Sequence, residues 1–206
     1  MIGSSELRAR PGRGVRAVKP VALRREAKVE AIVAAAWELA RVHGIAGISL
    51  RDLARVVGLK QPSLYVYFDS KDALYDEMFA DGNRQLVARI EALDLPADPR
   101  LAVKVFIRAW ISFALEDIAR YQLLFQRHIP GFTPSPESYE LAERALRPLI
   151  GLVRDAGAAD PGDLDCIIAV VAGLTDAQIS NDPTGDRWIR HTDRLIDLLI
   201  DHTNQE

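Results

Sequence analysis

The sequence predicts an all-α protein. After residue 23, apolar residues recur in most segments at the three-four spacing of an amphipathic helix. No segment shows the strict alternation of apolar and polar residues, bounded by turn signals, that marks a half-buried strand. Glycine and proline stand mostly between the periodic segments, where they end one helix or open the next. We expect an N-terminal three-helix bundle with a helix-turn-helix, followed by a larger helical domain.

Residues 1–22 are predicted to be a disordered basic tail. They show no sustained period and carry five basic residues among glycine, proline and serine: Arg8, Arg10, Arg13, Arg16 and Lys19. Such a segment is either a solvated leader or an arm that follows a nucleic-acid backbone or enters a minor groove. Both interpretations stay open.

The first helix is predicted from Arg24 to His43. Its apolar stripe consists of Val29, Ile32, Val33, Ala36, Trp37 and Ala40. Gly44 follows, and glycine accepts the left-handed conformation that often ends a helix. Trp37 lies on the stripe, so we expect it in the core.

Two short helices come next. Ser49 stands three residues before Asp52, a spacing typical of a helix start, and this second helix stops at Gly58. Pro62 suits the first turn of the third helix, predicted at about 60–67, because the missing N–H has no partner there. Helices joined in this way form a helix-turn-helix candidate.

Ser70 is a good N-cap for a long fourth helix that runs through Leu74 to Leu93. Further helices are predicted at 98–118, 120–127, 136–156, 162–180 and 185–202, with joints at Pro130-Gly131, Gly157-Ala158 and Asn181 to Pro183.

Charge is divided unevenly along the chain. Residues 1–71 hold 13 basic and 6 acidic residues, whereas the remainder holds 13 basic and 23 acidic residues. A basic first third indicates contact with a polyanion. There is no apolar run long enough to cross a bilayer and no apolar signal-peptide region, so we expect a cytoplasmic protein. The single cysteine, Cys166, lies in an apolar run and is expected to be buried.

In a helix-turn-helix, the second helix enters the major groove and its first residues reach base edges. That placement puts Lys60, Gln61 and Ser63 at the bases, since Gln pairs with adenine, Lys with guanine and Ser with either base. Tyr65 and Tyr67 would donate hydrogen bonds to phosphates from the flank. Lys71, at the start of the fourth helix, would also meet phosphate, and Leu64 would face inward.

The run GIAGISLRDLARVVGLKQPSLYVYFDSKDALYDEMF, residues 44–79, resembles the DNA-binding domain of the tetracycline-repressor (TetR) family of bacterial transcription regulators. The resemblance covers about residues 26–80. It implies that seven residues approach the operator DNA: Ser49, Gln61, Pro62, Ser63, Tyr65, Tyr67 and Lys71. We add Arg51 and Lys60 from their charge and position. The expected division is a DNA-binding domain at 23–70 and an effector-binding and dimerisation domain at 71–206.

The resemblance also implies a small-molecule effector and a homodimer. Bulky residues between 106 and 132 suggest a largely apolar effector pocket, with Phe106, Trp110, Phe113, Tyr121, Phe125 and His128 as candidates. Arg108, Gln126 and His128 are possible orienting groups, although for any single candidate a place in the core is the favoured interpretation. The apolar faces of 162–180 and 185–202 are candidates for the dimer interface: Ile168, Val171, Leu174, Leu195 and Leu198. A monomeric core needs such faces as well.

These features predict a ligand-responsive repressor that binds a palindromic operator. A regulator without an effector, an all-α enzyme and a protein-interaction module are the alternatives. Four scattered histidines and the absence of a phosphate-binding glycine loop speak against an enzyme, and no metal or cofactor is predicted. Asp193, Asp197 and Asp201 recur every four residues, which a solvated helix face explains better than a metal site.

Overall fold

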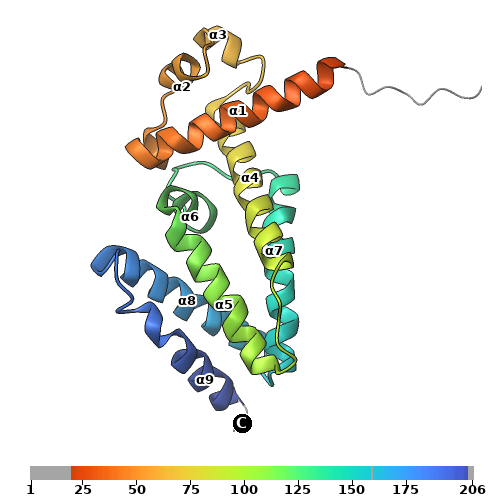
Figure 1. The fold of residues 1–206 in the computed structure, drawn as a ribbon, viewed down its shortest axis with the longest axis vertical. Coiled ribbons are helices and arrows are strands. Elements are labelled where there is room, and N and C mark those ends of the chain that lie inside the picture. Colours follow the sequence, from red (N-terminus) through yellow and green to blue (C-terminus); the bar gives the residue numbers. More distant parts are fainter. Residues whose placement is uncertain (1–19, 159, 204–206) are drawn as a thin grey trace, which may run out of the picture.

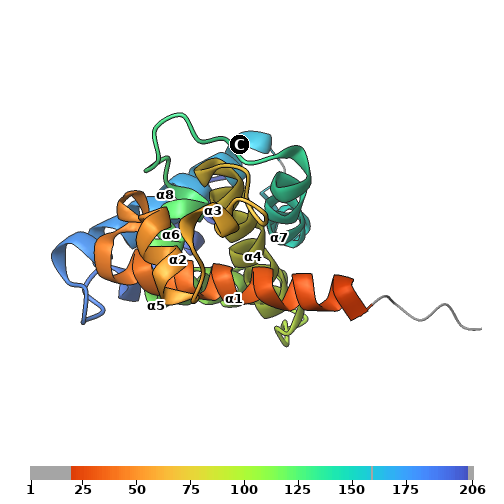
Figure 2. The same cartoon turned by 90° about the horizontal axis from the view of Figure 1, so that it is seen from above.

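The computed structural model describes residues 20–158 and 160–203, and these residues form helices, turns and loops without any strand. The all-α prediction is confirmed. In Figure 1 the short helices α2 and α3 lie at one end of the molecule and α1 crosses above the remaining bundle. Seen from above, α1 lies across the end of α4 (Figure 2). The predicted tail falls mostly on residues 1–19, outside the described part, but residues 20–22 already belong to α1.

The first helix, α1, spans Pro20–His43, and its predicted apolar stripe is buried except for Val29, which is half-buried. A 3-10 turn, η1, follows at Ile45–Gly47, and α2 spans Leu50–Val56. The Ser49 hydroxyl accepts a hydrogen bond from the Asp52 amide at 3.3 Å, as the predicted start requires. Gly58 has a φ of 69°, which lets the chain leave α2 and turn into the next helix.

The third helix is shorter than predicted, since α3 spans only Gln61–Leu64. Its backbone then continues as a turn, in which the amides of Tyr67 and Phe68 both donate to the Leu64 carbonyl. Leu64 and Phe68 are buried and hold this turn against α1 and α2. Residues 60–67 therefore protrude from the bundle, and we call them the α3 projection.

Helix α4, Lys71–Glu91, runs through both parts of the molecule. The Ser70 hydroxyl caps it by accepting from the Ala73 amide at 3.0 Å. Its first half, including Leu74 and Met78, packs in the core of α1 to α3, whereas Leu86 and Ile90 pack in the C-terminal core. A rigid shift of α4 would therefore change the packing of both cores.

The C-terminal helices are α5 (Pro99–Glu116), α6 (Ile118–Phe125), α7 (Pro136–Asp155), α8 (Pro161–Asn181) and α9 (Thr192–Thr203). Helix α5 lies between α7 on one side and the α8–α9 pair on the other (Figure 1). The larger C-terminal helical domain is thus present.

The predicted helix at 185–202 was wrong at its start. After α8 the chain forms a loop and a 3-10 turn, η2, at Ile189–His191 before α9 begins. The Gln178 amide oxygen explains this, because it accepts from the backbone amides of Trp188 at 2.9 Å and Ile189 at 3.3 Å. A buried side chain from α8 thereby takes the place of helical hydrogen bonds.

Three ion pairs join α9 to α5 and account for the four-residue repeat of aspartates. Asp193, Asp197 and Asp201 pair with Arg108, Lys104 and Arg100 at 2.6, 2.6 and 2.5 Å. Arg108, a possible orienting group for an effector, is therefore engaged between helices.

Candidate functional site

The α3 projection presents the side chains predicted to read DNA. Lys60, Gln61, Pro62 and Tyr65 are exposed, and the Tyr65 side chain keeps 48% of its area open to solvent. Ser63 and Tyr67 are half-buried. Leu64 faces inward, as predicted. The resulting surface offers an amide, an ammonium and two phenols around one short helix.

Two further predicted residues flank this projection. Arg51 is exposed on α2, while Ser49 is half-buried because its hydroxyl caps that helix. Neither Arg51 nor Lys60 forms an ion pair within the part of the chain that is described. Their charges are open to an external anion.

Lys71 has an internal role that the sequence did not indicate. Its ammonium donates to the Ala46 carbonyl at 3.2 Å and lies 5.2 Å from the centre of the Tyr75 ring. The buried Tyr75 hydroxyl donates to the neighbouring Ile45 carbonyl at 3.0 Å. The side chains of Lys71 and Tyr75 thus hold the beginning of α4 against η1, and the Lys71 ammonium places a positive charge at this contact.

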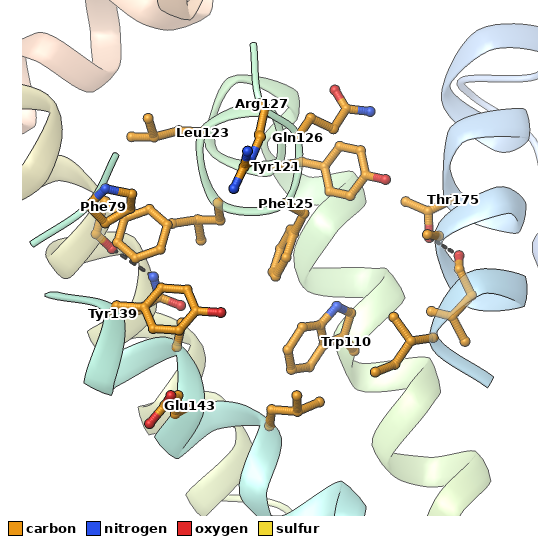
Figure 3. A pocket seen from close by; sticks show the side chains of 18 of the residues that line it. Phe79, Trp110, Tyr121, Leu123, Phe125, Gln126, Arg127, Tyr139, Glu143 and Thr175 are labelled. Atoms are coloured by element: carbon orange, nitrogen blue, oxygen red, sulfur yellow. Dashed lines mark hydrogen bonds between the residues drawn. The ribbon is translucent and has the colours of Figure 1, made fainter. Parts of the chain in front are cut away.

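A cavity of about 500 Å³ lies in the C-terminal domain, between α4, α5, α6, α7 and α8. The segment 126–135, which joins α6 to α7, closes one side of it. Trp110, Tyr121 and Phe125 are at its wall, and Figure 3 shows Phe79 and Tyr139 on the opposite side from Trp110.

Most of the wall is apolar, and several lining residues were not foreseen because they come from helices far apart in the sequence. They include Phe79, Leu123, Leu124, Ile129, Phe132, Leu146 and Leu149. Polar and charged groups on the wall include Asn83, Gln126, Arg127, Tyr139, Glu143, Thr175 and Asp176.

Three residues predicted for the pocket do not line this cavity. Phe106 is fully buried and stacks on Trp110 with 6.0 Å between ring centres, so it supports the wall from behind. Phe113 is also buried and carries the Arg120 guanidinium 3.6 Å from its ring centre. His128 is exposed on the joining segment.

Asp176 of α8 joins two sides of the cavity. One oxygen, Oδ1, accepts from the Tyr121 hydroxyl and from the Gln126 side-chain amide, each at 2.7 Å. Burial raises the pKa of Tyr121 above its ordinary value, and the hydrogen bond to Asp176 raises it further. Tyr121 therefore stays a neutral donor at physiological pH.

The residues predicted for a dimer interface are divided by the fold. Ile168 and Val171 line the cavity, and Leu174 is buried within the chain. On α9, Leu198 is exposed and Leu195 is half-buried. The outer side of α8 instead exposes Cys166, Ala169 and Gly173, so the expectation of a buried cysteine was wrong. Apolar periodicity cannot distinguish a helix side that faces a cavity from one that faces solvent.

Polar contacts connect the cavity helices to α1. The Trp37 indole N–H donates to Asp81 of α4 at 2.9 Å, and the same carboxylate oxygen accepts from Gln85 at 2.7 Å. Gln85 in turn accepts from Arg120 of α6 at 2.8 Å. Burial lowers the pKa of the Arg120 guanidinium, while the carboxylate of Asp117 opposes that shift.

Within the described residues, no group of three or more histidine, cysteine or acidic side chains could hold a metal ion. None of the described helices is both long enough and apolar enough to span a membrane.

Residues 32–78 match the family described as "Bacterial regulatory proteins, tetR family". The chain is 32% identical over 127 residues to the HTH-type transcriptional regulator Rv1816 of Mycobacterium tuberculosis, covering 57% of this chain and 53% of that protein. It is 30% identical over 118 residues to the class D tetracycline repressor protein of Escherichia coli, covering 57% and 51%. The chain spans about half the length of these curated relatives.

Solved structures share the fold over a greater length. The TetR-family regulator PfmR from Thermus thermophilus has a TM-score of 0.61 at 22% identity, covering 82% of this chain and 97% of that one. FadR from Bacillus subtilis, solved with stearoyl-CoA, gives 0.64 at 18% identity, covering 82% and 96%. BioQ, solved with its double-stranded DNA operator, gives 0.59 at 24% identity, covering 86% and 98%.

Proposed function

We propose, from the premise that this chain belongs to the tetR family of bacterial regulatory proteins, that it is a cytoplasmic repressor. Its affinity for operator DNA would change when a small molecule binds. A homodimer would place two α3 projections in successive major grooves of a palindromic operator, about 34–36 Å apart.

The exposed α3 projection supports the DNA-binding part of this proposal. Gln61 and Lys60 begin the helix, where side chains reach base edges, and Tyr65 stands one turn further on. Ser49, Arg51, Pro62, Ser63, Tyr67 and Lys71 complete the proposed contact set. Two of them, Ser49 and Lys71, also have structural roles inside the chain.

The observation that carries the proposal is the continuity of α4. Phe79 and Asn83 of this helix line the cavity, while Lys71 at its beginning is fastened to η1 beside the DNA-binding helices. A ligand that favours a different position of α4 therefore changes the placement of the α3 projection. A largely apolar cavity of about 500 Å³, which is a typical size for a ligand site, favours a regulator with an effector over one without.

The relatives fit the same scheme. FadR was solved with stearoyl-CoA and BioQ with operator DNA, so one fold accommodates an acyl-CoA in one protein and DNA in another. We propose both kinds of partner for this chain, with a largely apolar effector. The dimer would use α8 and α9, with the exposed Leu198 and the half-buried Leu195 at the contact. The buried Val171 and Leu174 would lie beneath it, whereas Ile168 lines the cavity and is exposed.

Fluorescence anisotropy tests the DNA-binding part with a labelled duplex from the region upstream of the protein's own gene. We expect tight binding that weakens steeply as salt rises, because phosphate contacts release counterions. A shuffled duplex of equal length should bind far more weakly. Equal affinity for the two duplexes would contradict sequence-specific regulation.

A further inference from the structure

The charged groups on the cavity wall are mainly acidic. Three lining side chains are charged, namely Arg127, Glu143 and Asp176. Within the described residues, neither Glu143 nor Asp176 forms an ion pair with a lysine, arginine or histidine. By contrast, Glu91 and Asp193 on neighbouring helices are paired with Arg144 and Arg108. The cavity thus leaves two negative charges without a positive partner.

One carboxylate oxygen of Asp176 accepts no hydrogen bond from the described residues. Both hydrogen bonds to Asp176, from the Tyr121 hydroxyl and the Gln126 amide, reach Oδ1, and Oδ2 accepts none from the rest of the described chain. Both donors are neutral, so they orient the carboxylate without cancelling its charge. Asp176 is exposed, so its free oxygen is open to a bound cation.

Aromatic rings extend from Asp176 into the cavity. The ring of Tyr121 lies 5.6 Å from that of Phe125, which lies 5.1 Å from that of Trp110. Figure 3 shows these three rings along one wall. Aromatic faces attract cations, most strongly those with diffuse charge such as alkylated ammonium groups. A carboxylate beside successive rings is therefore suited to an ammonium or amidinium group.

The rest of the wall suits an apolar body. Ile107, Leu146, Leu149 and Val171 also line the cavity. A carboxylate or phosphate head group would instead meet two carboxylates and one guanidinium, all on exposed residues, so the net negative charge of the wall disfavours an anion.

We propose that the effector is a cationic amphiphile, with its positive group at Asp176 against Tyr121 and Phe125 and its apolar body among the aliphatic residues. Glu143 adds to the negative potential of the site. This proposal rests on the proposed function, because it specifies the chemical class of the ligand that the regulator detects.

Calorimetric titration of the full chain tests it with three probes that share a ten-carbon tail: decyltrimethylammonium, decanoate and decanol. The two ionic probes are kept below their micelle-forming concentrations and decanol below its solubility limit. Equal tails make the apolar contribution nearly constant, so the head group decides the order. We expect decyltrimethylammonium to bind about tenfold more tightly than decanoate, with decanol between them.

Asp176→Asn keeps the size of the side chain and an acceptor for Tyr121 and Gln126 but removes the charge. It should bring the affinities for the ammonium and the carboxylate to within about twofold of each other. Glu140→Gln is the matched control, because Glu140 is exposed on α7 and does not line the cavity. It should leave the preference for the ammonium unchanged.

Decanoate binding as tightly as the ammonium, no measurable binding of any probe, or an unchanged preference in Asp176→Asn would each overturn the proposal. The comparison of the three probes on the unaltered chain tests the proposal without any variant. It therefore remains a valid test even if Asp176→Asn folds poorly. The proposed function fails by a different result, namely equal affinity for the upstream and shuffled duplexes without any probe present.

Discussion

Arg41 of α1 is joined to Asp117, the N-cap residue of α6. The guanidinium donates from Nε to Oδ2 at 2.9 Å, and a second nitrogen lies 2.8 Å from the same oxygen. Asp117 is buried, and its other oxygen accepts from the Arg120 amide. One carboxylate therefore starts α6 and ties it to the first helix. Because Tyr121 and Phe125 of α6 line the cavity, this pair lies between the cavity and the DNA-binding helices.

Arg41→Ala should loosen α6 selectively. Asp117 would keep its cap but lose its ion-pair partner, so we expect a loss of about 1–2 kcal/mol in the free energy of unfolding. Amide hydrogen exchange over residues 118–125 should become faster. Glu38→Ala is the control, since Glu38 pairs with Arg41 only at the exposed surface. Equal exchange in the Arg41 variant and the unaltered chain would show that the pair does not hold α6.

Three substitutions probe the proposed DNA-binding surface, two on the α3 projection and one at the start of α4. Gln61→Ala should weaken operator binding about tenfold, because a paired amide is lost from a base edge. Tyr65→Phe should weaken it about fivefold by removing one hydrogen bond to phosphate. The Arg154→Ala control changes an exposed residue of α7 and should have no effect. Anisotropy titrations that leave the affinity of both Gln61→Ala and Tyr65→Phe unchanged would remove these residues from the interface.

Lys71→Ala is the third substitution, and it needs a second measurement. Loss of a phosphate contact should weaken operator binding and reduce the salt slope by about one. The same change removes the bond to the Ala46 carbonyl, so a thermal melt must accompany the titration. Weaker DNA binding with an unchanged salt slope would mean that Lys71 acts only by positioning η1.

The fold was largely predictable because its signals are local. The caps at Ser49 and Ser70, the stops at Gly44 and Gly58, and the apolar stripe of α1 each depend on neighbours within a few residues. The start of α9 was missed because it depends on Gln178, a side chain one helix earlier.

The cavity was only partly predictable for the same reason. Trp110, Tyr121 and Phe125 lie in the stretch where bulky residues are concentrated, but Phe106 and Phe113 lie there too and face the core. Asp176 carried no signal, because a single aspartate on an amphipathic helix gives no hint that Tyr121 will reach it from 55 positions away.

Gly58→Ala should destabilise the protein by about 1–2 kcal/mol. The backbone at Gly58 has a φ of 69°, and nothing lies within 4 Å of the added methyl group, so the cost is conformational strain alone. Gly151→Ala is the control within α7, where the added methyl group also meets open space. It should stabilise the protein by up to about 1 kcal/mol, since alanine favours helix. Denaturant melts that give both variants the same sign would contradict this account.

Asp76→Ala should release the segment 126–135 that closes the cavity. The Asp76 carboxylate accepts three hydrogen bonds at the start of α7: from the Ser135 amide at 2.7 Å, the Ser135 hydroxyl at 2.8 Å and the Ser138 hydroxyl at 3.0 Å. Without it, only contacts such as that of Phe132 with the Tyr75 ring, 5.7 Å between centres, hold the segment to α4. We expect a loss of about 2 kcal/mol in the free energy of unfolding.

The same variant should be cut by trypsin much faster after Arg127, which is exposed within the released segment. Asp98→Ala is the matched control, because Asp98 caps α5 by a single bond from the Leu101 amide at 2.9 Å. It should cost about 1 kcal/mol and leave cleavage after Arg127 unchanged. Equal cleavage rates in the two variants would mean that global unfolding, rather than release of the segment, exposes Arg127. A faster rate in Asp76→Ala alone would instead identify Asp76 as the residue of α4 that keeps the cavity closed.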